Sequence, residues 1–192
     1  DGIWVKDGFD TNVINSKIWI TETNFYQEEG ILVSPGNGVV HQTLVKRSFD
    51  VFNASIDVRV VSGNGRVGLW YQDYAEEGGH VYTLYFNAGT GNFELDGAKD
   101  AEGNTKTYTP AEPVKVGDDA VFTTIGLHVE EGKLVAYVNG EAVITHEAET
   151  LGQVRSQILL FNMGGNVAEW DNFTLASANT YIFSPVLYGD VD

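Results

Sequence analysis

The sequence predicts an all-β protein, a two-sheet antiparallel β-sandwich of the jelly-roll kind. Three observations support this prediction: short runs in which apolar and polar residues alternate, turn signals rich in Gly, Asn and Asp between them, and no apolar stripe of helical period. The 192 residues suffice for one well-buried core and require no second domain. We therefore predict one domain over residues 1–178, followed by a C-terminal tail or linker at 179–192.

The alternating segments follow one another along the chain, and each has the period of two that a half-buried strand shows. They lie at residues 30–35, 54–61, 66–73, 80–87, 92–97, 124–132, 133–144, 157–163 and 168–176. The breaks at 62–65, 87–92 and 138–141 contain the Gly and Asn residues that supply positive φ angles in tight hairpins. The polar stretch 100–119 is expected to be a long surface loop.

Composition restricts the possible partners. The chain has 27 Asp and Glu against 11 Lys and Arg, a formal net charge of -16, which repels phosphate backbones and anionic lipids. We therefore expect neither nucleic acid nor a membrane as a partner. There is no Cys, and no apolar run approaches the roughly 18 residues of a membrane span. Because the sequence begins at Asp1 without Met or a signal peptide, we expect a mature or excised segment.

Four segments have an informative order and spacing. They are DGFDTNVINSKIW at 7–19, YQEEGILVSP at 26–35, GLHVEEGKLVAYVNGEAV at 126–143 and AEWDNFTL at 168–175. Together they resemble the concanavalin A-like lectin/glucanase superfamily, in particular its laminin-G-like, sugar-binding and family 16 glycoside hydrolase members. The resemblance covers roughly residues 3–176. It implies a two-sheet jelly roll with one concave face.

The same resemblance implies a structural Ca²⁺ that joins the N- and C-terminal strands. By position, Asp171 would supply the carboxylate, Gly30 one carbonyl, and Gly8 or its neighbour Asp7 another. Ligation by oxygen alone suits a hard cation such as Ca²⁺. The alternative is that Asp171 caps a turn or occupies an exposed strand position.

The superfamily topology also implies a glycan-binding surface. If the strands that carry them are neighbours, one concave face gathers Asp57, Arg59, Trp70, Gln72, Tyr85, Asn87 and His128. Aromatic rings offer flat platforms to the C–H faces of sugars, and the polar side chains can pair with hydroxyl groups. The alternative is that Trp70 and Tyr85 complete a core cluster or an interface with a neighbouring module.

Family 16 glycosidases hold two catalytic carboxylates in a Glu-x-Asp-x-x-Glu strand. The nearest string here is Glu94–Lys99, in which Lys99 replaces the second Glu, so we interpret it as a hairpin strand with incidental acids. A group of Asp57, Arg59 and His128 is a further enzymatic alternative. We predict a non-catalytic, lectin-like carbohydrate-binding module that binds a polysaccharide or oligosaccharide and holds a structural calcium. The alternatives are a glycoside hydrolase or lyase of this superfamily, and a protein-binding adhesion or structural module.

The last residues, LYGDVD, resemble the start of a type I dockerin, whose first calcium loop opens with Gly-Asp-x-Asp. Asp190 and Asp192 would be its first two ligands, unless the short match is due to chance. This resemblance implies neighbouring modules or a cohesin as partners, in an extracellular, secreted or cell-surface, polysaccharide-degrading system such as a cellulosome.

Overall fold

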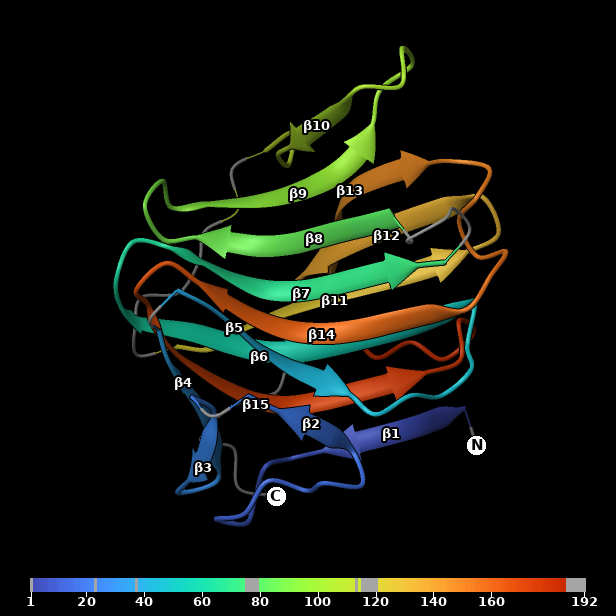
Figure 1. The fold of residues 1–192 in the computed structure, drawn as a ribbon. Coiled ribbons are helices and arrows are strands. Elements are labelled where there is room, and N and C mark those ends of the chain that lie inside the picture. Colours follow the sequence, from blue (N-terminus) through green and yellow to red (C-terminus); the bar gives the residue numbers. More distant parts are fainter. Residues whose placement is uncertain are drawn as a thin grey trace.

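The computed structural model describes residues 2–22, 24–36, 38–74, 80–112, 114 and 121–185, and its regular elements there are all β-strands. The strands form two antiparallel sheets that face each other (Figure 1). This arrangement confirms the predicted all-β sandwich. None of the described residues forms a helix long and apolar enough to cross a membrane.

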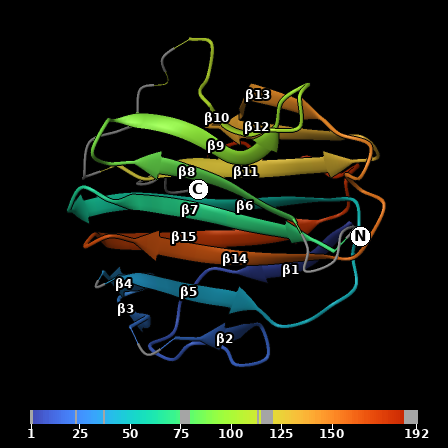
Figure 2. The same ribbon diagram turned by 45° about the horizontal axis from the view of Figure 1, so that its top comes forward.

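We call the first sheet sheet A. Its strands lie in the order β13 (Glu141–Glu147), β12 (Lys133–Val138), β11 (Thr123–Glu130), β6 (Phe52–Ser62), β15 (Val167–Ala176), β4 (Ile31–Pro35) and β3 (Tyr26–Glu28), and β1 (Ile3–Asp7) also pairs with β15. Sheet B has the order β10 (Thr105–Tyr108), β9 (Asn92–Lys99), β8 (His80–Asn87), β7 (Arg66–Asp73), β14 (Ser156–Met163), β5 (Val39–Leu44) and β2 (Trp19–Thr21). The tilted view of Figure 2 shows β7, β8 and β14 stacked over strands of sheet A.

The core lies between the sheets and is built from the inward members of each alternation. Trp19 on β2 meets Phe173 on β15 edge to face, with ring centroids 4.8 Å apart. Trp170 is fully buried, and its indole N–H donates to Ser34 Oγ at 3.0 Å. A buried indole of this size needs such a partner, because an unpaired N–H in an apolar core is costly.

Two sequence-based boundaries need correction. The predicted loop at 100–119 contains β10, which pairs with β9, although residues 113 and 115–120 lie outside the described part. The predicted tail also begins too early, because Phe183 is only 2% exposed and stacks on Tyr137 with ring centroids 4.1 Å apart. The packed domain therefore continues beyond residue 178. Asp190 and Asp192 of the dockerin-like motif lie outside the described residues.

The C-terminal segment 177–185 packs on the outer face of sheet A. Tyr181 donates its hydroxyl to the Gly140 carbonyl at 2.8 Å, and Asn53 donates its amide to the Thr180 carbonyl at 2.7 Å. Gly126 makes room for this segment, since a Cβ there would lie 2.4 Å from the Phe183 ring. The C-terminal segment thus covers part of the outer face of sheet A.

Candidate functional site

The predicted ligand-binding residues do not share one face. Asp57 and Arg59 on β6 and His128 on β11 lie on the outer side of sheet A, whereas the others lie on the outer side of sheet B: Trp70 and Gln72 on β7, Tyr85 and Asn87 on β8. The prediction of a single face is therefore wrong. Because the turn after β6 carries the chain from one sheet to the other, outward positions on β6 and β7 point in opposite directions.

The sheet A members of this set are engaged in structural contacts. Asp57 is buried and accepts hydrogen bonds from Thr124 Oγ1 at 2.5 Å and Asn172 Nδ2 at 2.9 Å. Arg59 pairs with Glu169 at 2.9 Å and lies over the Phe122 ring.

The alternative acid/base group is likewise not assembled. His128 lies opposite Asn53 and makes a 2.6 Å contact with it, whereas Asp57 lies opposite Thr124. His128 and Asp57 are therefore offset by four residues along the strands, about 13 Å, and cannot act on one bond together.

The outer face of sheet B, which we call the sheet B face, carries a hollow of about 290 Å³. Its lining residues come from β7, β8, β9 and β14: Arg66, Trp70, Val81, Thr83, Tyr85, Asp96, Gly97, Phe161 and Met163. The Trp70 ring is held edge-on by His41 and Phe161, at centroid distances of 5.2 and 6.3 Å. Trp70 Nε1 has no hydrogen-bond partner among the described residues. The atom is buried, so the hollow offers the ring of Trp70 as an aromatic surface rather than its N–H.

Two carboxylates, Glu94 and Asp96, lie on this same face. In the register of β8 and β9, Glu94 is opposite Tyr85 and Asp96 is opposite Thr83, while Phe93 and Leu95 point into the core. The interpretation of these acids as incidental was based on Lys99, which replaces the second Glu of the family motif. It did not use the fact that Phe93 and Leu95 are apolar, which places Glu94 and Asp96 together on the opposite face of the strand. That alternation, read together with the position of β9 beside β8, is the signal that identifies the pair.

Both carboxylates have defined partners. Glu94 accepts from Asn87 Nδ2 at 2.9 Å and lies opposite Tyr85. Asp96 Oδ1 accepts from the Gly97 backbone N–H at 3.0 Å and from Thr107 Oγ1 at 3.2 Å. Burial, with Glu94 as the next cause, raises the pKa of Tyr85 to about 12, so the phenol stays protonated at neutral pH. Side chains at i and i+2 of a strand start about 6.6 Å apart on one face, so both acids can reach one glycosidic bond.

The residues of the predicted calcium site come from adjoining strands. Asp7 on β1 lies opposite Phe173 on β15, and Leu32 on β4 lies opposite Trp170, so the turn at Gly30 adjoins the same part of β15 as Asp171. Asp7 already accepts hydrogen bonds from the Phe9 N–H and from Trp19 Nε1, both at 2.8 Å.

Asp171 is the unusual acid of this region. Burial raises its pKa to about 6, and the negative charges of Asp57, Asp10 and Asp7 add to this effect against one backbone hydrogen bond from Asn172. This excess of buried negative charge fits a cation held by oxygen atoms. Within the described ranges, no three Asp, Glu or His side chains are grouped closely enough to hold a metal by themselves. A cation here would therefore need backbone carbonyls, such as those of Gly30 and Gly8, and the calcium site stays a prediction.

No family model matches the sequence, and no curated protein matches it. Solved structures match it along nearly its whole length. The catalytic domain of an endo-1,3-β-glucanase (laminarinase) from Thermotoga petrophila RKU-1 superposes with a TM-score of 0.70 at 14% identity, covering 93% of this chain and 98% of that one. SCLam, a non-specific endo-β-1,3(4)-glucanase from family GH16, gives a TM-score of 0.72 at 10% identity, covering 92% and 91%.

LamA from Z. galactanivorans, solved in complex with laminaritriose and laminaritetraose, gives a TM-score of 0.70 at 11% identity and covers 92% of this chain and 99% of that one. The prediction of a non-catalytic carbohydrate-binding module is corrected by these matches, because the Thermotoga enzyme and SCLam, which share the fold over this length, are endo-glucanases. At these identities the likeness establishes the fold alone: the chain is a two-sheet antiparallel jelly roll, as these structures are.

Proposed function

We propose that this protein is a glycoside hydrolase that cleaves a polysaccharide on the sheet B face. The observation that supports this most directly is the position of Glu94 and Asp96, two carboxylates on one strand face beside the Trp70 hollow. Glycoside hydrolysis requires two carboxyl groups that flank the scissile bond, one to protonate the leaving oxygen and one to act as base or nucleophile. The similarity to endo-glucanases supports the same activity.

The surroundings of the two acids suggest different roles. A bound glycan that excludes water disfavours two adjacent anions, so one of them takes a proton. Asp96 is held by the backbone N–H of Gly97 and by Thr107 Oγ1, and we assign it as base or nucleophile. Glu94 accepts from the side-chain amide of Asn87 and lies opposite Tyr85. We assign Glu94 as the general acid.

Trp70 is the proposed sugar platform. Its ring lines the hollow and offers an apolar surface to a pyranose. Gln72 follows on the same face of β7 and lies opposite Gln157 of β14, which adds amide donors and acceptors along the groove.

We further propose that Asp171 and the carbonyls of Gly30 and of Gly8 or Asp7 would hold a structural Ca²⁺. The ion would neutralise the carboxylates around Asp171 and fasten β1 to β15. The Gly-Asp-x-Asp motif at the C-terminus supports an extracellular setting, with a dockerin and its cohesin as partners.

The catalytic proposal is tested by measuring reducing-end release from a panel of β-1,3-glucan, mixed-linkage β-glucan and acidic polysaccharides. Glu94→Gln and Asp96→Asn should each lower kcat by about 100-fold or more, the usual loss when a positioned acid or base is removed. Glu141→Gln, at an exposed position on β13 of the other sheet, is the matched control and should retain full activity. Release by Glu94→Gln at the wild-type rate would rule out the assigned acid.

A further inference from the structure

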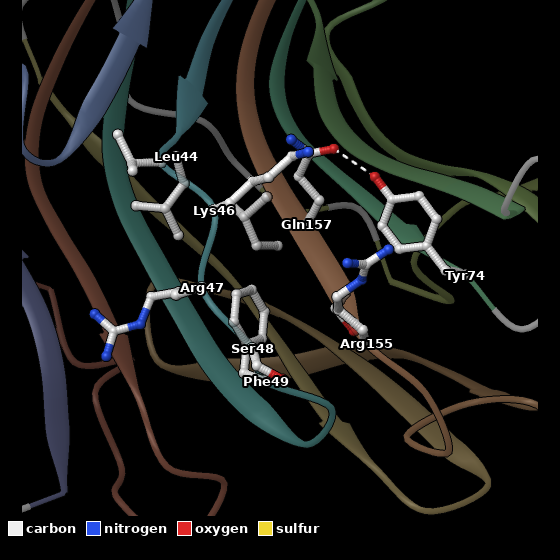
Figure 3. Close-up of a pocket in the computed structure, with 11 residues that line it drawn as sticks. Leu44, Lys46, Arg47, Ser48, Phe49, Tyr74, Arg155 and Gln157 are labelled. Atoms are coloured by element: carbon white, nitrogen blue, oxygen red, sulfur yellow. Dashed lines mark hydrogen bonds between the residues drawn. The ribbon is translucent and has the colours of Figure 1, made fainter.

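A second hollow opens at one end of sheet B, where β5 and β7 end and β14 begins (Figure 3). It has a volume of about 450 Å³ and is lined by Leu44, Val45, Lys46, Arg47, Ser48, Phe49, Tyr74, Arg155, Ser156, Gln157 and Ile158. We call it the end pocket. Its floor is apolar, since Leu44, Phe49 and Ile158 are buried, while Lys46, Arg47 and Arg155 are exposed at its rim.

The charge of this region is opposite to that of the molecule. A smaller hollow next to the end pocket shares Lys46 and Arg47 with it and adds Lys6 and Lys17. The two hollows together hold 5 of the 11 Lys and Arg residues, and no Asp or Glu lines either of them, although the chain has 27 acids. If the charged residues were distributed at random, acids would outnumber bases around these hollows, because the chain has 27 acids and 11 Lys and Arg residues.

These cations are also not neutralised by the described residues. Among those residues, Arg59, Lys106 and Lys133 each form an ion pair with a carboxylate, whereas no ion pair is formed by Lys46, Arg47 or Arg155. Exposed cations grouped around a hollow create a local positive potential that attracts an anion.

Two of the three cations that line the end pocket, Arg155 and Arg47, contact neighbouring groups. The Arg155 guanidinium lies 4.9 Å from the Tyr74 ring centre, and the Tyr74 hydroxyl donates to Gln157 Oε1 at 2.7 Å. Arg47 donates to the Trp4 carbonyl at 3.3 Å, and Figure 3 shows its side chain directed away from Tyr74 and Arg155. The guanidinium of Arg155 is thus fixed in place before a ligand arrives, which lowers the entropy lost on binding.

The end pocket continues the proposed glycan groove. Gln157 lines the pocket and lies opposite Gln72, two residues along β7 from Trp70. Tyr74 follows Gln72 with the same alternation, so Trp70 and Tyr74 are about 13 Å apart along the sheet. An oligosaccharide that stacks on Trp70 can therefore reach the end pocket.

We infer that the end pocket is a subsite for an anionic sugar unit, and that the substrate is an acidic polysaccharide. The recognised group is a carboxylate of a uronic acid or a sulfate ester, since both are planar or multivalent acceptors that a guanidinium and an ammonium group bind well. This inference rests on the proposed glycan-directed function. It adds the substrate class, which the neutral glucans of the similar structures do not suggest.

The test is direct binding to the intact protein by calorimetry, which needs no catalysis. The probes are an oligogalacturonate, a sulfated oligosaccharide and, as the neutral reference, a laminarin oligosaccharide. The double variant Lys46→Gln, Arg155→Gln is compared with the control Lys106→Gln, Lys133→Gln, which removes two exposed cations outside the pocket. Melting temperatures verify that all variants are folded.

The expected result is that one anionic probe binds more tightly than the neutral probe. The pocket variant should lose about tenfold or more of that affinity, as removal of charge-assisted hydrogen bonds does, while the control keeps it. The anionic probe that binds more tightly, and loses affinity in the pocket variant, identifies the recognised group as a carboxylate or a sulfate. Equal affinity of the pocket variant and the wild type, or no preference for either anionic probe, overturns the inference. Intact anion binding without cleavage of any polysaccharide would instead refute the proposed hydrolase and leave the subsite standing.

Discussion

Glu94 lies directly opposite Tyr85 in the register of β8 and β9, and its charge adds to burial in raising the pKa of the Tyr85 phenol. Tyr85 is 2% exposed, so its side chain is held beside a carboxylate on the sheet B face. Alternation predicted Tyr85 as a ligand contact, whereas Glu94 was interpreted as an incidental acid.

Tyr85→Phe removes a buried hydroxyl opposite Glu94 and should lower kcat by up to about tenfold, because loss of one polar contact costs about 0.5–1.5 kcal/mol. The measurement is steady-state kinetics on the best polysaccharide of the panel. Tyr26→Phe removes a hydroxyl from an exposed tyrosine on sheet A and serves as the control. Unchanged kcat in Tyr85→Phe would show that Glu94 does not depend on this contact.

Trp70→Ala should raise KM about tenfold or more, since the variant loses the stacking platform. The corresponding change at an exposed aromatic residue of the other sheet, Tyr26→Ala, should leave KM unchanged. A KM that stays at the wild-type value in Trp70→Ala would place the glycan elsewhere.

In metal-free protein, the raised pKa of Asp171 makes stability depend on pH in a defined direction. Because the folded-state pKa is about 6 and the ordinary value is 3.8, the folded protein binds the proton more tightly, so stability falls as pH rises from about 4 to about 6. Asp171→Asn should remove this slope. At pH 7 it should raise Tm by about 2–4 °C, the effect of about 1 kcal/mol once solvent screening is allowed for. Thermal melts between pH 4 and pH 7 measure both effects, and a slope kept by the variant would contradict the assignment.

Added Ca²⁺ should reverse the order of the melting temperatures, so that the wild type melts above Asp171→Asn. Wild-type protein should melt at a higher temperature with Ca²⁺ than with EDTA, because a bound cation compensates the carboxylates around Asp171. Asp171→Asn should lose this difference, whereas Asp50→Asn, at an exposed position, should keep it. Identical melting of the wild type in Ca²⁺ and in EDTA would refute the calcium proposal.

Gly126→Ala should lower the free energy of unfolding by about 1–3 kcal/mol, because the added Cβ collides with the Phe183 ring. In the Phe183→Ala background the same change should cost less, since the colliding ring is absent and only the Ala54 carbonyl oxygen, 2.9 Å from the added Cβ, still opposes it. Urea denaturation of the two single variants and the double variant measures this coupling. Additive losses would show that the C-terminal segment does not pack on Gly126 in solution.

The period-two pattern was sufficient to predict the sandwich and to separate inner from outer residues within a strand. It assigned Trp70 and Gln72 to an outer face and Leu69 and Tyr71 to the core, as the structure has them. It could not say to which sheet a strand belongs, because alternation carries no information on the partner strand. Asp57 and Trp70 were therefore placed together although the sandwich separates them.

Other features lacked a local signal altogether. The segment 177–185 has no alternation, and its burial depends on Tyr137 and Gly126, which are distant in sequence. The end pocket likewise combines residues from the segments after β5 and β7 with the start of β14, so only the folded chain reveals its charge. Glu94 and Asp96 are an intermediate case. Their spacing on one strand face could be predicted from the sequence, but the residues of β8 that lie beside them could not.

The path of the C-terminal segment has a consequence for how this domain is joined to others. Pro185 lies near Gly140 on the sheet A side, so a module joined after it would be attached on the side of the domain opposite the sheet B face. Such a module would leave the sheet B face uncovered. If that face binds a polysaccharide as we propose, a long chain would lie across it without meeting the linker, as cleavage within a chain rather than at its ends requires.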